Sequence, residues 1–572
     1  MATAKSALNP QRVQSRELLF QTLEELNISF LFGVEGTCEL PLIDGCAEHP
    51  SVQYIQVLHE NIAVGAAMGF GRMTGKPGVC VLHVTPGVAH SVANLFNAWK
   101  ARIPVIVIGG QQHTELSIQE PILWSSTVDM VRQYTKWSYE IKNTYELPSV
   151  LQRAFKEAMT PPMGPVFLSW PVDISIAEAS RGAYPVTKVG SRFCGDLDAI
   201  RQAAKLLVKA TAPAIIAGDG CGLSEAWPEL VELAELLGAP VYSESLSTNM
   251  NYPSHDYHWQ WELAGDAPTM REQLAKYDTV LFAGFSSHAP MTVYPGGPPL
   301  VPDSVTKIYL HYNEWEIAKN YPGDVAILGD IKTSLGPLNA AVKQDHHLKP
   351  AVVARRNRAL LKTHQELFKT WAAYIESHKL SNPINSAYIA AELAQIDPKN
   401  LVYVDEANTA NQPFQRLLKF KDHLSYFSGR GVALGYSMPV SLGVALSAPE
   451  RKVVNIVGDG AALFYPQVFW TAAKAKLPIT FIVLNNLQYK TLKQGLNAME
   501  KFWHIDTEPP GLNLGPPDLQ HAEIAKAYGI AGERVTESRD VRAALERGLT
   551  APGPYLLEFL VQREIDDTWP TG

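Results

Sequence analysis

Short apolar segments alternate with helix-length segments along almost the whole chain, and this alternation constrains the fold more than any other feature. In residues 1–175 the apolar segments are "FLFGV", "VQYIQVLH", "GVCVLHV", "PVIVIGG" and "PVFLSW". Strands that alternate with helices predict parallel sheets, because a parallel neighbour is reached only through a long crossover connection. We therefore predict an α/β fold made of doubly wound parallel sheets.

The alternation occurs in three blocks, and 572 residues are too many for one hydrophobic core. Residues 176–195 lose the pattern and gain Gly, Ser and Arg, whereas residues 343–382 are polar and helix-prone. Both segments are typical of connectors. The predicted domains are an N-terminal domain (1–180), a central domain (196–342) and a C-terminal domain (383–572).

Two distant segments share one pattern. "RAFKEAMTPPMGPVFLSWPV" (153–172) and "RAALERGLTAPGPYLLEFLV" (542–561) each contain a helix-like stretch, then Thr, Pro and Gly-Pro, and then a strand. We interpret them as the ends of two domains with related topology. Duplicated domains of this kind can face each other and share a ligand.

The composition disfavours several classes of function. Hydrophobic residues make up 46% of the chain and charged residues 19%, as in a well-packed globular protein. A formal net charge of -8 gives no basic patch for nucleic acid. The five cysteines are odd in number and lack metal-type spacing, which predicts reduced thiols in a cytoplasm. No segment resembles a signal peptide or a membrane span, although residues 1–11 leave a short transit peptide open.

Two strands of the third block end in polar residues. "KVVNIV" is followed by Gly458, Asp459 and Gly460, and "ITFIVL" is followed by Asn485 and Asn486. Carboxyl ends of parallel strands meet at one edge of a sheet, where ligands bind. Carboxylate and amide oxygens suit Mg²⁺, and a helix start after Gly460 would direct backbone N–H groups at phosphates. The motif predicts a metal and phosphate site; the alternative is two helix caps.

A second Gly-Asp-Gly stands at 218–220, after "PAIIA". No Asn-Asn pair follows it, since Asn249 and Asn251 are separated by a Met. We interpret this copy as a structural turn.

Together with the motif at 458–460, several segments resemble the thiamin-diphosphate-dependent decarboxylase family. They are "FGVEGTCELP" (32–41), "HENIAVGAAMGFGRMTGKPG" (59–78), "LFNAWKARIPVIVIGGQQ" (95–112) and "GYSMPVSLGVALSAPERKVVNIVGDG" (435–460). Within the family, "NAW", "GGQQ", "KWSYE" and "PGLNLGPPDLQHAEIAKAYG" favour the benzoylformate decarboxylase group. The resemblance covers nearly the whole chain.

The resemblance implies a pyrimidine-binding, a central and a diphosphate-binding domain, with thiamin diphosphate and Mg²⁺ as cofactors. It assigns Glu60 to the pyrimidine ring, which this carboxylate drives into its imino form. It assigns Leu434, five residues before Pro439, to the support of the bent cofactor. Taken alone, Glu60 would be a helix cap and Leu434 a core residue.

The same resemblance supplies contacts for the metal and the diphosphate. The expected metal ligands are Asp459, the side chain of Asn486 and the backbone carbonyl of Gln488. The expected diphosphate contacts are Asn408, Gly458, Gly460 and Ala461.

Three further residues are candidates for substrate binding and proton transfer. His83 in "CVLHVTPG" matches an active-site His, and Thr37 in "EGTCELP" matches a substrate-binding Ser; both could instead be structural. The family has a second His in its central domain. An ungapped match places Met291 there, with His288 three residues earlier, so either His288 has this role from a shifted position or the role is lost.

We therefore predict non-oxidative decarboxylation of a 2-oxo acid, with an aryl or branched side chain, to an aldehyde and carbon dioxide. One alternative is a carboligase or lyase with the same cofactors, of the acetolactate synthase or 2-hydroxyacyl-CoA lyase type, which His83 disfavours. Another is a dinucleotide-binding or non-catalytic α/β protein, although no G-x-G-x-x-G follows a strand. The expected assembly is a homodimer or homotetramer with active sites between subunits, without nucleic-acid or membrane partners.

Overall fold

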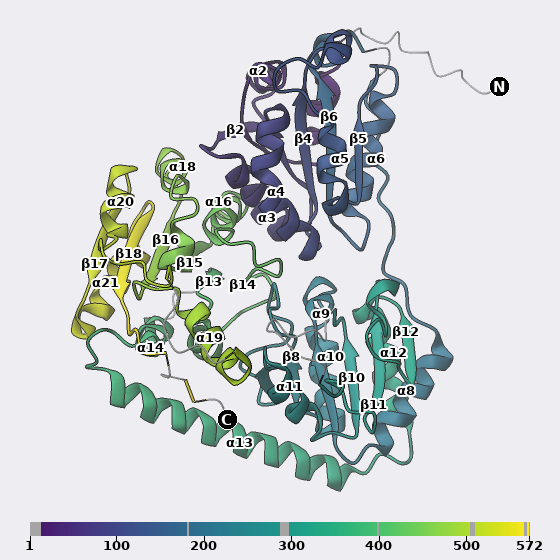
Figure 1. Cartoon of the computed structure of the whole chain (residues 1–572). Coiled ribbons are helices and arrows are strands. Elements are labelled where there is room, and N and C mark those ends of the chain that lie inside the picture. The colour runs from purple at the N-terminus through teal and green to yellow at the C-terminus, as the bar shows by residue number, and fades with distance from the viewer. Residues whose placement is uncertain are drawn as a thin grey trace, which may run out of the picture. The chain divides into compact units, whose positions relative to one another are not determined.

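The computed structural model describes residues 13–179, 182–286, 297–396, 400–503, 510–565 and 569–570. It contains three six-stranded sheets in which every paired strand is parallel to its neighbour (Figure 1). The predicted fold class, three doubly wound α/β sheets, is confirmed.

The first sheet has the strand order β2-β1-β3-β4-β6-β5. Its strands are β1 (Phe30–Val34), β2 (Gln53–Gln56), β3 (Gly78–Leu82), β4 (Val105–Gln111), β5 (Trp137–Glu140) and β6 (Pro165–Pro171). The helices around it are α1 (Glu17–Glu25), α2 (Leu40–Glu48), α3 (Glu60–Thr74), α4 (Val84–Lys100), α5 (Thr127–Val131), α6 (Leu147–Met159) and α7 (Val172–Ile176).

The third sheet repeats this order, as β14-β13-β15-β16-β18-β17. Its strands are β13 (Leu401–Glu406), β14 (Tyr426–Phe427), β15 (Lys452–Gly458), β16 (Ile479–Asn485), β17 (Ala531–Val535) and β18 (Tyr555–Leu560). The strands of the two matching segments, β6 and β18, occupy the same place in their sheets, so the prediction of two domains with related topology is confirmed.

Helices of this C-terminal region are α14 (Ser386–Ile396), α15 (Asn411–Leu417), α16 (Ser437–Ser447), α17 (Asp459–Ala462), α18 (Val468–Lys474), α19 (Lys490–Trp503), α20 (His521–Ala527) and α21 (Val541–Thr550).

The central sheet has a different order, β12-β11-β10-β7-β8-β9. Its strands are β7 (Pro213–Ala217), β8 (Val241–Ser243), β9 (Trp259–Glu262), β10 (Thr279–Ala283), β11 (Thr306–His311) and β12 (Val325–Leu328). Its helices are α8 (Leu197–Lys209), α9 (Asp219–Leu223), α10 (Trp227–Leu237), α11 (Ala267–Leu274) and α12 (Ile331–Gln344). The predicted helical connector is present as α13 (Pro350–His378), a 29-residue helix in which Trp371 is the buried residue.

The chain forms two compact units. The first comprises the chain up to Gly190 with Gly431–Pro449 and Tyr465–Leu477, and the second comprises Ser191–Arg430, Glu450–Phe464 and the chain from Pro478 onward. The predicted domain boundaries stay a prediction. None of the described helices combines the length and the apolar composition needed to cross a membrane.

In the first unit, α3 and α16 pack closely because glycines line their contact. A Cβ added to Gly69 of α3 would overlap the carbonyl of Val440, and one added to Gly443 of α16 would overlap the carbonyl of Ala66. The glycine spacing in "GAAMGFG" therefore allows the two backbones to approach.

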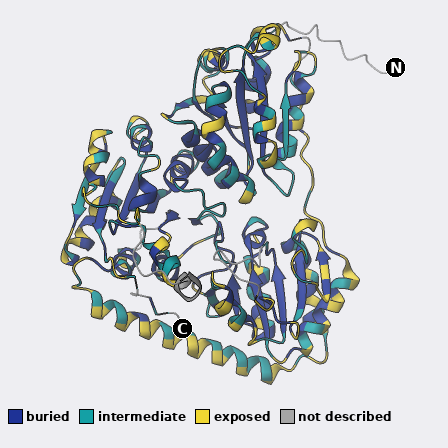
Figure 2. Ribbon diagram, in the orientation of Figure 1, coloured by how far each residue is buried: buried dark blue, intermediate teal, exposed yellow. Residues whose placement is uncertain are grey.

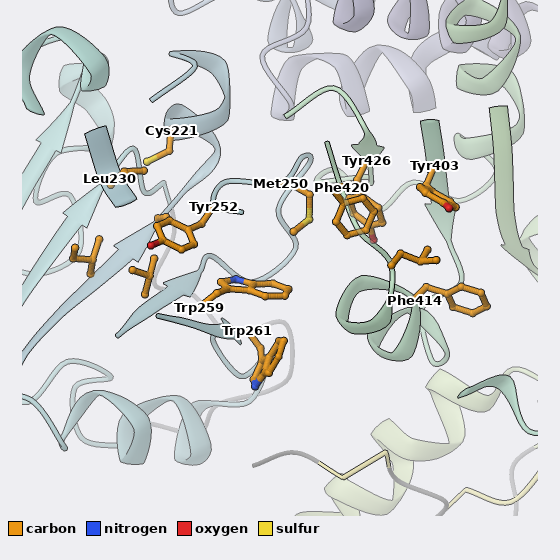
Figure 3. Packing of buried hydrophobic residues seen from close by; sticks show 14 of the residues in the cluster. Cys221, Leu230, Met250, Tyr252, Trp259, Trp261, Tyr403, Phe414, Phe420 and Tyr426 are labelled. Carbon is orange, nitrogen blue, oxygen red and sulfur yellow. The ribbon is translucent and has the colours of Figure 1, made fainter. Parts of the chain in front are cut away.

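In the second unit, one continuous hydrophobic core joins the central sheet to the third sheet. Trp259 and Trp261 of β9 and Tyr252 lie on one side, and Phe414 and Tyr426 lie on the other (Figure 3). The inner strands of each sheet are buried throughout most of their length (Figure 2). These cores hold the strand ends, and the residues that follow them, in fixed positions.

Candidate active site

The structure brings the two polar strand ends of the third sheet into contact. β15 and β16 are neighbouring strands, and Asp459 directly follows β15. The carboxylate oxygen Oδ2 of Asp459 accepts hydrogen bonds from the backbone N–H groups of Asn486 (3.1 Å) and Leu487 (2.7 Å). The predicted carboxylate and amide groups therefore lie together at the carboxyl edge of this sheet.

The loop after β16 turns sharply, and this turn brings its backbone N–H groups to Asp459. Leu487 adopts the left-handed conformation, with φ of 57°, which an L-residue adopts only at a cost. The side-chain oxygen of Asn486 accepts the backbone N–H of Gln488 at 3.0 Å. The carbonyl of Gln488 accepts the N–H of Lys490 at 3.0 Å and keeps a second lone pair.

Asp459 is buried, and the described residues place only backbone N–H groups against its carboxylate. Asp459 is 4% exposed, and no Lys, Arg or His among the described residues forms an ion pair with its carboxylate. Burial raises the pKa of the Asp459 carboxyl to about 6, although the backbone N–H groups oppose this shift. A buried carboxylate of this kind, beside amide and carbonyl oxygens, fits a hard cation such as Mg²⁺.

The residues expected on the diphosphate side occupy the same sheet edge. Gly458 ends β15, and the N–H of Gly460 donates to Asp459 Oδ1 at 2.8 Å. Ala461 lies in α17, which is only four residues long. Asn408 is exposed and follows β13, the strand that pairs with β15.

A buried lysine next to this loop was not predicted from the sequence. Lys493 of α19 is 8% exposed, and its Nζ donates to the side-chain oxygens of Gln488 (2.9 Å) and Asn513 (2.8 Å). The backbones of the same two segments are also hydrogen-bonded, since the N–H of Tyr489 donates to the carbonyl of Leu512 at 2.9 Å. Lys493 thus ties the loop after β16 to the segment around Asn513. The sequence signal was a lysine one helical turn after the Asn-Asn loop.

In the first unit, Glu60, His83 and Thr37 follow three adjacent strands. Glu60 begins α3 after β2, Thr37 follows β1, and His83 follows β3 directly. The order of the sheet reverses at β1 and β3, where open α/β sheets bind ligands. The Oε2 of Glu60 lies 3.1 Å from Nδ1 of His90, a contact that the sequence did not predict.

His83 is held by a buried carboxylate, Glu39, which sequence analysis also missed. Nδ1 of His83 lies 2.7 Å from Oε2 of Glu39, which is 0% exposed and also accepts the N–H of Gly36. Burial raises the pKa of the Glu39 carboxyl, and the neighbouring His83 opposes this shift. This hydrogen bond fixes the ring and leaves Nε2 for another partner. The signal for Glu39 was an acidic residue in "EGTCELP", two positions after Thr37.

The remaining candidates differ in position. Thr37 is exposed, and Leu434 is half-buried in the stretch before α16. His288 and Met291 lie outside the described residues.

The second Gly-Asp-Gly has a different environment. Asp219 accepts the N–H and the hydroxyl of Thr248, both at 2.9 Å, and the side-chain amide of Asn249 at 3.2 Å. The guanidinium of Arg430 bridges Asp219, at 3.2 Å, and the buried carboxylate of Glu244. Protein groups therefore neutralise this aspartate.

Comparison with known proteins shows the family. Models of the thiamine pyrophosphate enzyme family match residues 14–127 (N-terminal TPP binding domain), 200–338 (central domain) and 409–559 (C-terminal TPP binding domain).

Two curated relatives and one solved structure illustrate the similarity. A benzoylformate decarboxylase from Pseudomonas aeruginosa is 26% identical over 95% of this chain and 98% of its own length. An acetolactate synthase from Mycobacterium bovis is 24% identical over 98% of this chain and 90% of its own length. The structure of a 4-hydroxybenzoylformate decarboxylase from Rhodococcus jostii shares the fold, with a TM-score of 0.83, 23% identity and coverage of 97% and 100%. The chain belongs to the thiamine pyrophosphate enzyme family.

Proposed function

We propose that the chain decarboxylates a 2-oxo acid with an aryl or branched side chain, giving an aldehyde and carbon dioxide, with thiamin diphosphate and Mg²⁺. The observation that carries this proposal is His83, held through Nδ1 by the buried Glu39 at the same sheet edge as Glu60. A fixed imidazole whose Nε2 is left for another group suits the binding of a substrate carboxylate and the transfer of protons.

Asp459 and the loop after β16 would hold the metal. Asp459, the side-chain oxygen of Asn486 and the carbonyl of Gln488 are oxygen ligands of the type that Mg²⁺ prefers. Asn408, Gly458, Gly460 and Ala461 would contact the diphosphate at the same edge. When bound, thiamin diphosphate supplies a carbon nucleophile and an electron sink.

The first unit would act on the cofactor ring and on the substrate. Glu60 would exchange a proton with a nitrogen of the pyrimidine ring, and Leu434 would support the bent cofactor. His83 would bind the substrate carboxylate through Nε2, and the hydroxyl of Thr37 would donate a second hydrogen bond. His288 is retained as a candidate for the later protonation.

A carboligase is the second candidate, because an acetolactate synthase matches 98% of the chain at 24% identity, against 95% at 26% identity for the benzoylformate decarboxylase. Such an enzyme would use the same cofactor residues. The decarboxylase and the carboligase differ in the residues that contact the substrate carboxylate and donate protons. His83 is therefore the residue that distinguishes the two functions.

We also propose a homodimer, doubled to a homotetramer, with Glu60 and Asp459 contributed to each site by different subunits. Support comes from apolar side chains exposed in and after the 3₁₀ segment Thr114–Gln119 of the first unit. Ile118 is 89% exposed and Ile122 is 87% exposed, as expected for residues that a partner covers. Mixing Glu60→Gln and Asp459→Ala chains should restore part of the activity through hybrid sites.

The function is tested with a panel of 2-oxo acids, with aldehyde, carbon dioxide and coupled 2-hydroxyketone measured together. The proposal expects aldehyde and carbon dioxide in equal amounts; a coupled product as the main one would favour the carboligase. His83→Ala should lower turnover at saturating substrate by about 10²–10⁴-fold and leave cofactor affinity intact. A variant that is less stable but fully active would return His83 to a structural role.

A further inference from the structure

Three buried asparagines form a continuous hydrogen-bonded series in the first unit. Asn61 lies in α3, and Asn94 and Asn97 lie in α4. Their exposed fractions are 0%, 0% and 1%. Most buried amides are hydrogen-bonded, and each contact in such a series fixes a position. The side-chain nitrogen of Asn61 is the exception here, because it has no hydrogen-bond partner among the described residues. We call Asn61, Asn94 and Asn97 the asparagine ladder.

One end of the ladder holds the start of α3. The backbone N–H of Asn94 donates to the side-chain oxygen of Asn61, and the side-chain amide of Asn94 donates to the backbone carbonyl of Asn61; both distances are 2.8 Å. Asn61 is therefore held through its backbone and its side chain. Its neighbour in the sequence is Glu60, the first residue of the helix.

The other end of the ladder holds the stretch that carries Leu434. Asn97 donates its side-chain amide to the carbonyl of Ala433 at 2.9 Å and accepts the N–H of Ala433 at 3.1 Å. Asn97 thus binds this backbone as a neighbouring strand would. Gly431 makes room for it, because a Cβ there would overlap the side-chain oxygen of Asn97.

The two ends are joined by a direct contact, since the side-chain amide of Asn97 also donates to the side-chain oxygen of Asn94 at 2.9 Å. The stretch between β14 and α16 has no helix or strand in the described chain, so contacts with other segments, among them those of Asn97, hold it in position. The contact with Ala433 lies one residue before Leu434.

We infer that the asparagine ladder is a set of positioning residues that fixes the Leu434 stretch relative to Glu60. This inference rests on the proposed function in one respect, namely that Glu60 and Leu434 contact the cofactor. The ladder would act before any substrate binds, by holding the cofactor-binding shape of the first unit.

The test compares cofactor affinity with stability. Asn97→Leu keeps the branched shape of the side chain but removes both hydrogen bonds to Ala433, so thiamin diphosphate should bind about tenfold more weakly at saturating Mg²⁺. Affinity is measured by quenching of tryptophan fluorescence, and the Tm is measured on the cofactor-free protein. Asn94→Ala, which removes the middle of the ladder, is the second variant and should weaken binding by about threefold.

Asn339→Ala is the matched control. Asn339 is also buried, at 2% exposure, and donates its amide to Glu229 and Glu232 in the central region. Its loss should lower the Tm and leave cofactor affinity unchanged. A ladder variant that behaves like this control would overturn the inference.

A double-mutant cycle separates positioning from general stability. If Asn97 acts through the stretch that it holds, Leu434→Ala should weaken cofactor binding much less in Asn97→Leu than in the wild-type chain. Additive effects would contradict the ladder. Glu60→Gln in the same series tests the proposed function by itself: unchanged turnover in Glu60→Gln would refute that function, whereas impaired Glu60→Gln with unaffected ladder variants would refute only the ladder.

Discussion

The two Gly-Asp-Gly turns of the second unit have the same sequence but different electrostatic surroundings. Each follows the strand next to the reversal of its sheet, and both aspartates are buried, Asp219 at 6% and Asp459 at 4% exposure. Asp219 forms an ion pair with Arg430, whereas within the described residues Asp459 receives only backbone N–H groups. The two copies of the motif therefore differ in the cation beside the aspartate, which is present for Asp219 and absent, among the described residues, for Asp459.

The loops that bind the two aspartates share one backbone feature, a leucine in the left-handed conformation. Leu246 precedes Thr248 in the loop that binds Asp219, and Leu487 lies in the loop that binds Asp459; their φ angles are 56° and 57°. Both aspartates thus accept N–H groups from a loop that contains a left-handed leucine. Arg430 supplies the positive charge at the first turn. We propose that Mg²⁺ supplies it at the second.

The largest expected effect comes from exchanging each aspartate for alanine. Asp459→Ala should lower turnover at saturating cofactor by about 10³-fold or more, because the metal loses its charged ligand. Asp219→Ala should change turnover per folded molecule by less than about tenfold, since its loss affects stability first. Turnover is measured on preparations normalised by their folded fraction. Equal losses in both variants would break the comparison.

Arg430→Gln should give the next largest effect. It leaves Asp219 and Glu244 buried without their cation, which should lower the free energy of unfolding by about 3–5 kcal/mol in urea titrations. Adding Asp219→Asn should recover part of this loss, because one uncompensated charge is removed. Arg132→Gln, at the exposed ion pair with Asp129, is the control and should cost about 1 kcal/mol or less. A neutral Arg430→Gln would show that Asp219 needs no cation.

Lys493→Met should have a smaller and more specific effect. The lysine holds Gln488 in place without being a proposed ligand, so the Mg²⁺ concentration at half-saturation should rise about tenfold. Lys493→Arg should rescue most of this change, because it keeps the charge and the donors. Metal titration in the presence of excess thiamin diphosphate measures both. If Lys493→Met lowers only the Tm of the cofactor-free protein, the lysine has a general structural role.

Leu246→Gly and Leu487→Gly should have the smallest effects. Glycine relieves the left-handed conformation but adds freedom to the unfolded chain, so each free energy of unfolding should change by about 1 kcal/mol or less. Thermal or urea unfolding of the two variants, side by side, measures the change. A large loss in one loop alone would mean that its leucine side chain, rather than its backbone, holds the aspartate.

Much of the fold and half of the candidate site could be predicted from the sequence. Strand ends follow from apolar segments, and parallel strands place their ends at one edge, so the proximity of Asp459 and Asn486 was predictable. The shared topology of the first and third sheets was visible in the two similar segments that end in β6 and β18.

The rest depends on contacts between distant parts of the chain. Arg430 lies 211 residues from Asp219, and Asn97 lies 336 residues from Ala433, so periodicity contains no information about either contact. Glu39 and Lys493 were missed for a related reason. A charged residue next to a helix start or on a helix is usually a solvated one, and only the folded chain shows that these two are buried.

Binding of Mn²⁺ in place of Mg²⁺ tests the central claim most directly, because its electron paramagnetic resonance signal counts bound ions. The metal-stripped protein is titrated with Mn²⁺ in the presence of thiamin diphosphate, as wild type, Asp219→Asn and Asp459→Asn. We expect one bound ion per chain in the wild type and in Asp219→Asn, and none in Asp459→Asn at the same concentrations. A bound ion that persists in Asp459→Asn, or disappears in Asp219→Asn, would contradict the account.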